Sequence, residues 1–323
     1  MLDRTHLGAI ANAIAGAQAF DTYRAGIAEN TIQRQQHDLA LFRSYLQSKI
    51  NVGDLYNDPQ AWSVVTWGFV QGFVLWMLER GYAIGSVNVR LATIKRYASL
   101  AHQASVIAQN ELNLIRSVRS YTSTRNIDKK RVVTRIGAKK AQSVRISKTQ
   151  RKALKRRINN KPQGACYALL MCLLLDHGLR VSEAISLPWD AINFEEGTIT
   201  FYRSKVDRTD THRLTPDTLE AAIAYRPFIL EGEQLFRSSK RGGGLALRGG
   251  LTRGAAQQIV RRLGYEVGID NLSPHDCRHS WATEFEKTHT PFELRDGGGW
   301  SSLLMPNRYV ERRKISHDGK DLD

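Results

Sequence analysis

The pattern of apolar and polar positions in the first hundred residues is that of a helical domain. Helices are predicted over residues 9–20, 31–49, 61–80 and 87–103. In the second of these, apolar residues recur at spacings near three and four, which is typical of a helix with one buried face. Gly81 is the expected end of the third. Because strand alternation is hard to find here, we expect a compact all-α domain over residues 1–108.

The second half mixes helices with a small amount of strand. Helices are predicted over 165–177, 251–263 and from Ser273-Pro274, and strands over 197–202 and 210–214 with a turn at 204–208. Gly178 is a natural C-cap, and Ser182 is a candidate cap for a short helix that ends before Pro188. Residues 297–299, all glycine, are expected to break the chain, and Pro306 to open a last helix that carries Tyr309. The fold class predicted is therefore mainly α with a small β-sheet (α+β).

A strongly basic segment separates the two halves. Between residues 125 and 157 there are 14 Lys or Arg and one acid, Asp128. The segment shows little apolar periodicity up to about Val144, while Ser147 or Thr149 is a candidate N-cap for a following helix. We therefore expect a basic interdomain linker over 109–147 and a second domain over 148–323 with a short C-terminal tail.

Composition and charge narrow the class of partner. The chain has 323 residues, 42% hydrophobic and 24% charged, with a formal net charge of +16. Such a field attracts polyanions, of which nucleic acid is the commonest. The most apolar segments, 64–78 and 165–175, fall short of the ~20 residues needed to span a bilayer. We expect a DNA-associated cytoplasmic protein with no signal peptide and no membrane partner.

The three cysteines, Cys166, Cys172 and Cys277, are too few and too irregularly spaced for a disulfide framework or a zinc site. The first two lie in an apolar run and are expected to be core residues, in a reducing compartment. His275 and His279 form an H-x-x-x-H pair, but no acid-rich cluster completes a metal site. We expect neither a metal nor a cofactor.

The second half contains the side chains that metal-free phosphodiester cleavage needs. Arginine donates two bonds to a phosphate and keeps its charge, Lys or His transfers protons, and Tyr can act as a covalent nucleophile. The candidates are Arg180, Lys205, His275, Arg278, Trp300 and Tyr309. His275 and Arg278 are three apart on one predicted helix and so share a face. Taken singly each signal is weak, because a lone Arg is usually solvated and a lone Trp or Tyr usually packs.

The order and spacing of these residues resemble the tyrosine recombinase (phage integrase) family. The string GLRVSEAISL at 178–187 resembles the family's G-L-R-x-x-E box, and SPHDCRHSWAT at 273–283 resembles its H-x-L-R-H box. GGGWSS, followed by Tyr309 nine residues after Trp300, resembles the last box. Lys205 matches the lysine that the family carries between the first two boxes. The match covers about residues 148–315, and the N-terminal half resembles the family's core-binding domain more loosely.

The resemblance implies a role for each matching residue. Tyr309 would attack the scissile phosphate and hold a 3′-phosphotyrosyl link. Arg180 and Arg278 would hold the non-bridging oxygens, and Lys205 would protonate the departing 5′-hydroxyl. His275 would assist proton transfer or hydrogen-bond the phosphate. Because an indole cannot act as a base, Trp300 would help only to position the groups of the site. The two remaining box residues, Glu183 and His279, would support these side chains from behind.

The chain departs from the family's pattern at two places. Cys277 replaces the usual Leu, and it is a tolerable small apolar substitute. Gly297 and Gly298 stand before Gly299 where an apolar residue is more common, so we hypothesise a looser segment around Trp300 and Tyr309.

The family also implies an architecture and partners. The two domains would form a C-shaped clamp on double-stranded DNA, without a separate arm-binding domain, and four protomers would assemble on two DNA sites. The implied function is site-specific recombination, and both integration of a phage or transposon and chromosome-dimer resolution fit. Two alternatives remain, a type IB topoisomerase-like relaxing enzyme and a non-catalytic DNA-binding protein.

Overall fold

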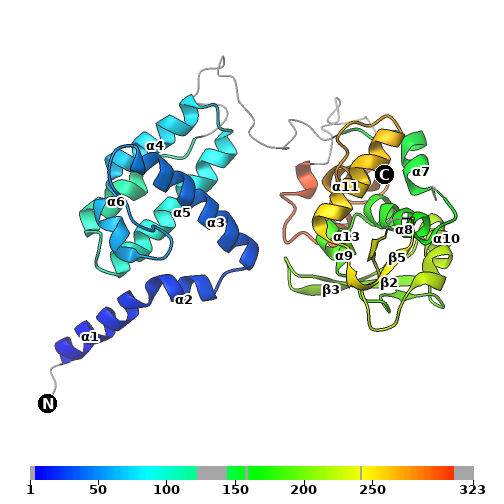
Figure 1. Ribbon diagram of the computed structural model, residues 1–323, viewed down its shortest axis with the longest axis horizontal. Coiled ribbons are helices and arrows are strands. Elements are labelled where there is room, and N and C mark those ends of the chain that lie inside the picture. The colour runs from blue at the N-terminus through cyan, green and yellow to red at the C-terminus, as the bar shows by residue number, and fades with distance from the viewer. Residues whose placement is uncertain (1–3, 122–143, 157–158, 241, 309–323) are drawn as a thin grey trace, which may run out of the picture. The chain divides into compact units, whose positions relative to one another are not determined.

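The computed structural model describes residues 4–121, 144–156, 159–240 and 242–308, and it divides the chain into two compact units, Met1–Lys139 and Lys140–Asp323 (Figure 1). In the described part, the first unit is helical and the second combines helices with two small antiparallel sheets. The prediction of a mainly α fold with a small amount of sheet is confirmed. None of the described helices combines the length and apolar character that a bilayer crossing requires.

The first unit is organised around one central helix. Its elements are α1 (Arg4–Ala17), α2 (Ala19–Ala25), α3 (Glu29–Gln47), η1 (Pro59–Val64), α4 (Trp67–Glu79), α5 (Ile84–Gln103) and α6 (Gln109–Ser117). Helix α5 contacts α2, α3, α4 and α6. Phe42, Trp62, Phe73 and Tyr97 are fully buried at the centre of this unit, where their rings pack tilted or stacked.

Two features of this unit differ from the sequence prediction. The helix expected over 61–80 is two elements, because the chain is extended at Val65 and Thr66 after a 3₁₀ turn that Pro59 opens. Residues from 109 on, expected to begin the linker, instead form α6. The two buried positions of α6, Leu112 and Ile115, are three apart and so cover one face of the unit's core. Most of the expected linker, residues 122–143, lies outside the described residues.

The second unit is built around one buried helix. Its helices are α7 (Lys148–Lys155), α8 (Pro162–Asp176), α9 (Val181–Ile185), α10 (Pro216–Tyr225), η2 (Arg226–Phe228), α11 (Arg253–Glu266), α12 (Pro274–Phe285), α13 (Pro291–Gly298) and η3 (Pro306–Arg308). Helix α8 contacts α7, α9, α10 and α12, and its residues from Gly164 to Leu175 are all buried. Cys166 and Cys172 are core residues as predicted, and burial raises the pKa of each thiol to about 12.

A three-stranded antiparallel sheet carries the predicted hairpin. Its strands are β1 (Ile192–Asn193), β2 (Thr198–Arg203) and β3 (Arg208–Arg213), paired in that order. The register of the hairpin runs from Thr198 opposite Arg213 to Arg203 opposite Arg208, so the turn falls where it was predicted. The second sheet, β4 (Arg237–Ser239) with β5 (Leu245–Gly250), and helix α10 were not predicted.

Helix ends follow the predicted caps with two corrections. Ser147 and Ser273 each cap a helix, and both caps are capping boxes. Ser182 is not a cap: α9 starts earlier because the Glu183 carboxylate accepts the backbone N–H of Arg180 at 2.7 Å. The glycine run was expected to interrupt the secondary structure, but its first two residues, Gly297 and Gly298, belong to α13. The helix ends at Gly299, which takes the left-handed conformation that glycine allows.

Candidate active site

Arg180 lies at the N-terminus of α9, held by the glutamate three residues later. One of its terminal nitrogens donates to Glu183 Oε1 at 2.6 Å, and the other donates to the carbonyl oxygen of Gly299 at 3.2 Å. The Arg180 side chain is 21% exposed, whereas that of Glu183 is 4% exposed. The carboxylate therefore fixes the guanidinium from the protein side.

Arg278 projects from α12 and is almost completely buried. Its two terminal nitrogens donate to the carbonyl oxygens of Gly178 and Gly298. Gly178 takes a positive φ after α8, and a Cβ there would overlap the ring of Trp281. The turn between α8 and α9 thus fits only glycine, and its carbonyl binds one of the two arginines predicted to hold the phosphate.

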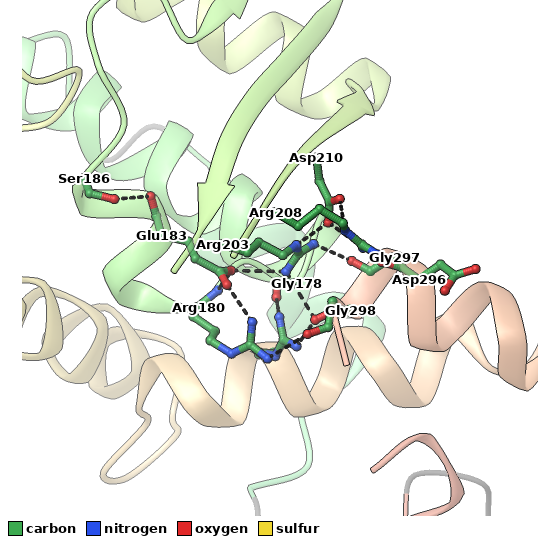
Figure 2. Close-up of polar contacts among 12 residues, drawn as sticks. Gly178, Arg180, Glu183, Ser186, Arg203, Arg208, Asp210, Asp296, Gly297 and Gly298 are labelled. Carbon is green, nitrogen blue, oxygen red and sulfur yellow. Dashed lines mark hydrogen bonds and ion pairs between the residues drawn. The ribbon is translucent and has the colours of Figure 1, made fainter. Parts of the chain in front are cut away.

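The glycine run joins the two predicted arginines, although they are separated by nearly a hundred residues (Figure 2). Gly298 O accepts from Arg278, and Gly299 O accepts from Arg180. These carbonyls lie at the C-terminal end of α13, where helix groups lack intrahelical partners and carry partial negative charge. The run that looked loose in the sequence is therefore bonded through its carbonyl oxygens.

A third arginine, which sequence reasoning missed, binds the same run. Arg203 is fully buried at the end of β2 and donates to Gly297 O at 2.7 Å and to Gly298 O at 3.2 Å (Figure 2). Its Nε donates to Asp210, and a terminal nitrogen lies 3.3 Å from Glu183 Oε2. Burial lowers the pKa of the Arg203 guanidinium, and the two carboxylates oppose that change.

A signal for Arg203 was present in the sequence. Alternation along the strand places Ile199, Phe201 and Arg203 on one face, and that face is buried. A charged side chain on the apolar face of a strand is unusual and requires partners. Asp210, across the hairpin, is the nearest of them. Burial alone would raise the pKa of Asp210, but hydrogen bonds from Arg208 and Arg203 lower it.

The residues predicted for proton transfer are at the surface. Lys205 is exposed in the turn between β2 and β3, as predicted. His275 is exposed in the first turn of α12, one turn before Arg278 on the same helix. His279 is half-buried, and burial, followed by the neighbouring His275, lowers the pKa of its imidazole.

Trp300 follows the glycine run directly and packs against α12. Its ring lies 4.6 Å from the guanidinium carbon of Arg278 and 6.3 Å from the ring of Trp281. A Cβ on Gly298 would come within 2.0 Å of the Trp300 ring. The second glycine of the run is therefore required by the position of the indole, which explains this departure from the family pattern.

The predicted nucleophile, Tyr309, lies outside the described residues. The last described element, η3, ends at the preceding residue and opens at Pro306, the position predicted to start the final helix. The structure thus brings Arg180, Arg278, Glu183 and Trp300 together around the glycine run.

A buried histidine, His177, and a half-buried one, His212, lie close to Arg203. The rings of His177 and His212 are 5.8 Å apart, and His212 contacts a terminal nitrogen of Arg203 at 3.4 Å. Burial lowers the pKa of each imidazole to about 4, and for His212 the neighbouring His177 and Arg203 act in the same direction. Both are therefore neutral near neutral pH.

Comparisons with known proteins identify relatives of the chain. The model of the phage integrase family matches residues 144–315, more than half of the chain. Tyrosine recombinase XerD of Neisseria meningitidis serogroup B is 32% identical over 132 residues, which cover 38% of this chain and 42% of the relative. Tyrosine recombinase XerC of Brucella suis is 28% identical over 213 residues, 61% of this chain and 65% of the relative. The matches thus span less than two thirds of these relatives.

Solved structures share the fold. A lambda integrase(75-356) dimer bound to a COC′ core site superposes with a TM-score of 0.64 at 16% identity, covering 95% of this chain and 99% of that one. The Tn1549 transposon integrase in complex with transposon right end DNA gives a TM-score of 0.64 at 15% identity, covering 94% and 95%. The class that the fold and the arginine cluster define is that of the tyrosine recombinases. The chain belongs to the phage integrase family.

Proposed function

We propose that this protein is a site-specific DNA recombinase that cleaves and rejoins strands through a 3′-phosphotyrosyl link at Tyr309. The observation that carries the proposal is the convergence of Arg180 and Arg278 on adjacent carbonyl oxygens of Gly298 and Gly299. Two guanidiniums fixed side by side match the charge that develops on the non-bridging oxygens of a phosphate under attack. The tyrosine follows nine residues after Trp300.

In this proposal the exposed side chains transfer protons, and the buried side chains hold the groups of the site in place. Lys205 protonates the 5′-oxygen as it leaves, and His275 hydrogen-bonds the phosphate or assists proton transfer. Trp300 positions the segment that leads to Tyr309. The reaction exchanges one phosphate ester for another, so the energy of the bond is stored in the phosphotyrosine and released on rejoining.

The partners proposed are double-stranded DNA and further copies of the chain. The helical first unit, which includes α6, serves as a core-DNA-binding domain, and the second unit serves as the catalytic domain. Lambda and Tn1549 integrases, which share the fold, were each solved on DNA. Four protomers on two sites is the assembly that we propose for strand exchange in cells.

The test uses duplexes of random sequence that carry a nick, so that the short fragment released by cleavage diffuses away. The wild-type protein should form a protein–DNA adduct that survives denaturation, and Tyr309→Phe should bind DNA without forming it. Sequencing of the trapped duplexes yields the target site. Gel shifts without any adduct from the wild type would indicate a non-catalytic binder and overturn the proposal.

A second assay separates recombination from the topoisomerase alternative. Supercoiled plasmid lacking the trapped sequence should stay supercoiled, while a plasmid carrying two copies of it should recombine. Relaxation of both plasmids at equal rates would identify a relaxing enzyme instead.

A further inference from the structure

Arg203 occupies a position that ordinary packing does not explain. It is fully buried on the inner face of β2, next to Ile199 and Phe201. Burying a guanidinium costs several kcal/mol of hydration, and the partners at best offset that cost, so an apolar residue would often serve stability as well. The residue stands two positions before Lys205, the proposed proton donor.

The bonds of Arg203 connect the hairpin to the glycine run. On the hairpin side, its Nε pairs with Asp210 of β3. On the other side, its terminal nitrogens donate to Gly297 O at 2.7 Å and Gly298 O at 3.2 Å. Arg208, on the opposite strand, donates to Asp296 O at 3.2 Å. Both strands that flank the Lys205 turn are therefore bonded to the C-terminal carbonyls of α13 (Figure 2).

The approach of Arg203 to the run depends on glycine. Gly299 has a φ of +58°, and a Cβ there would come within 2.4 Å of Arg203 Cδ. Gly298 O accepts from both Arg203 and Arg278. A displacement of the Arg203 guanidinium would therefore move the base of the hairpin relative to the arginines of the site.

We propose that Arg203 is a positioning residue for strand cleavage, which acts by fixing the Lys205 turn against the Gly297–Gly299 run. The proposal rests on the proposed function. Arg203 holds the β2 end of the turn while Arg208 holds the β3 end, so the exposed ammonium of Lys205 starts from a fixed base. Misplacement of a catalytic group by about 1 Å can cost ~100-fold in rate.

The experiment compares Arg203→Lys with Arg213→Lys. Lysine keeps the charge but loses the planar fork that serves several acceptors at once. Arg213 is an exposed arginine on the same hairpin and serves as the matched control. Single-turnover cleavage is measured on the trapped duplex and on the same duplex with sulfur as the 5′-bridging atom. A thiolate leaves without a proton donor, because the pKa of a thiol is only ~8.5.

The expected result is a 10- to 100-fold slower cleavage of the ordinary duplex by Arg203→Lys, on the order of what misplacement costs. On the sulfur duplex, this variant should cleave within about threefold of wild type, as should Lys205→Ala, because the step that general-acid catalysis accelerates is bypassed. Arg213→Lys should match wild type on both substrates.

Two results would overturn the inference. Wild-type rates for a folded Arg203→Lys on the ordinary duplex would remove any positioning role. Equal loss on both duplexes would mean that Arg203 acts through the phosphate-binding arginines. Should Arg203→Lys fail to fold, Asp210→Asn weakens the Arg203–Asp210 ion pair instead. Its cleavage rates on the ordinary and sulfur duplexes then test the inference in the same way. Failure of wild type to form any adduct would instead refute the proposed function.

Discussion

Gly298 combines two constraints in a residue without a side chain. Its carbonyl oxygen accepts from Arg203 and Arg278, and its α-carbon faces the ring of Trp300. Gly297, one residue earlier, has ordinary space around it, with the nearest side-chain atoms 3.7 Å from a built Cβ. The two neighbouring glycines of one helix thus differ in what they tolerate.

Gly298→Ala should destabilise the protein and displace Trp300. A methyl group 2.0 Å from the ring must push it away, and overpacking of this kind costs ~1–3 kcal/mol in the free energy of unfolding. Denaturant unfolding measures the change, and tryptophan fluorescence reports the ring. Gly297→Ala is the matched control and should leave stability the same or higher. Equal behaviour of the two variants would contradict the packing described.

Arg278→Lys should slow cleavage much more than it weakens DNA binding. Lysine cannot reach Gly178 O and Gly298 O together while presenting donors to a phosphate, and loss of one such donor costs ~100- to 1,000-fold in rate elsewhere. Single-turnover cleavage and fluorescence anisotropy measure the two quantities. Arg226 is an exposed arginine stacked on Phe194, and Arg226→Lys controls for the replacement of an arginine by lysine. A rate within threefold of wild type would remove Arg278 from the site.

His177 and His212 should make the protein less stable in mild acid. His177 and His212 have a pKa of about 4 in the folded protein, against ~6.5 when unfolded. Above pH 6.5 neither state is protonated, so stability is unaffected. Between pH 6.5 and 4 only the unfolded chain takes up the protons, so each histidine removes up to ~1.4 kcal/mol per pH unit.

Denaturant unfolding at pH 7 and pH 5 measures this effect. His212→Asn should reduce the difference in unfolding free energy between the two pH values. Thr209→Asn introduces the same side chain at an exposed position of β3 and should leave that difference as it is in wild type. A wild-type protein equally stable at both pH values would contradict the assignment.

At the scale of elements, the parts with local signals were predictable. The hairpin, the Ser147 and Ser273 caps and the buried helix α8 all agree with patterns of a few residues. Where tertiary contacts decide, the prediction failed. Helix α6 is stable because Leu112 and Ile115 complete a distant core. The cap of α9 is a separate case, because its partner is local but is Glu183 rather than the predicted Ser182.

The same division holds for the candidate site. The resemblance to the family's sequence boxes identified Arg180 and Arg278, and the structure brings both to the glycine run. Strand alternation placed Arg203 on the apolar face of β2, but no local spacing reveals its partners in the glycine run, which lie about ninety residues further along the chain. The glycines looked like a source of looseness, since the sequence does not show which side chains fill the space that a Cβ would take.

The cap of α12 provides a test at this scale. Ser273 and Asp276 form a capping box at the start of the helix that carries His275 and Arg278, and Asp276 also accepts the backbone N–H of Val144 at 3.2 Å. Ser273→Ala should cost ~1 kcal/mol in the free energy of unfolding and slow cleavage. Ser147→Ala removes the matched box of α7 and should cost a similar amount without slowing cleavage. Equal cleavage by the two variants would show that α12 tolerates a frayed start.

At the scale of the whole molecule, the net charge predicts that DNA binding depends steeply on salt. The net charge of +16 is carried by 47 basic and 31 acidic residues. If the basic residues neutralise phosphates, the logarithm of the binding constant should fall with the logarithm of salt concentration by ~0.9 per contact. Anisotropy titrations between low and moderate salt measure the slope. A slope near zero would contradict backbone binding.

The most direct test of the central claim is the chemical identity of the protein–DNA link. The trapped adduct is digested with trypsin and nuclease, and the joined peptide and nucleotide are identified by mass spectrometry. The account predicts a 3′-phosphate on the hydroxyl of Tyr309 and a free 5′-hydroxyl on the released strand. A link through another residue, or through a 5′-phosphate, would contradict it.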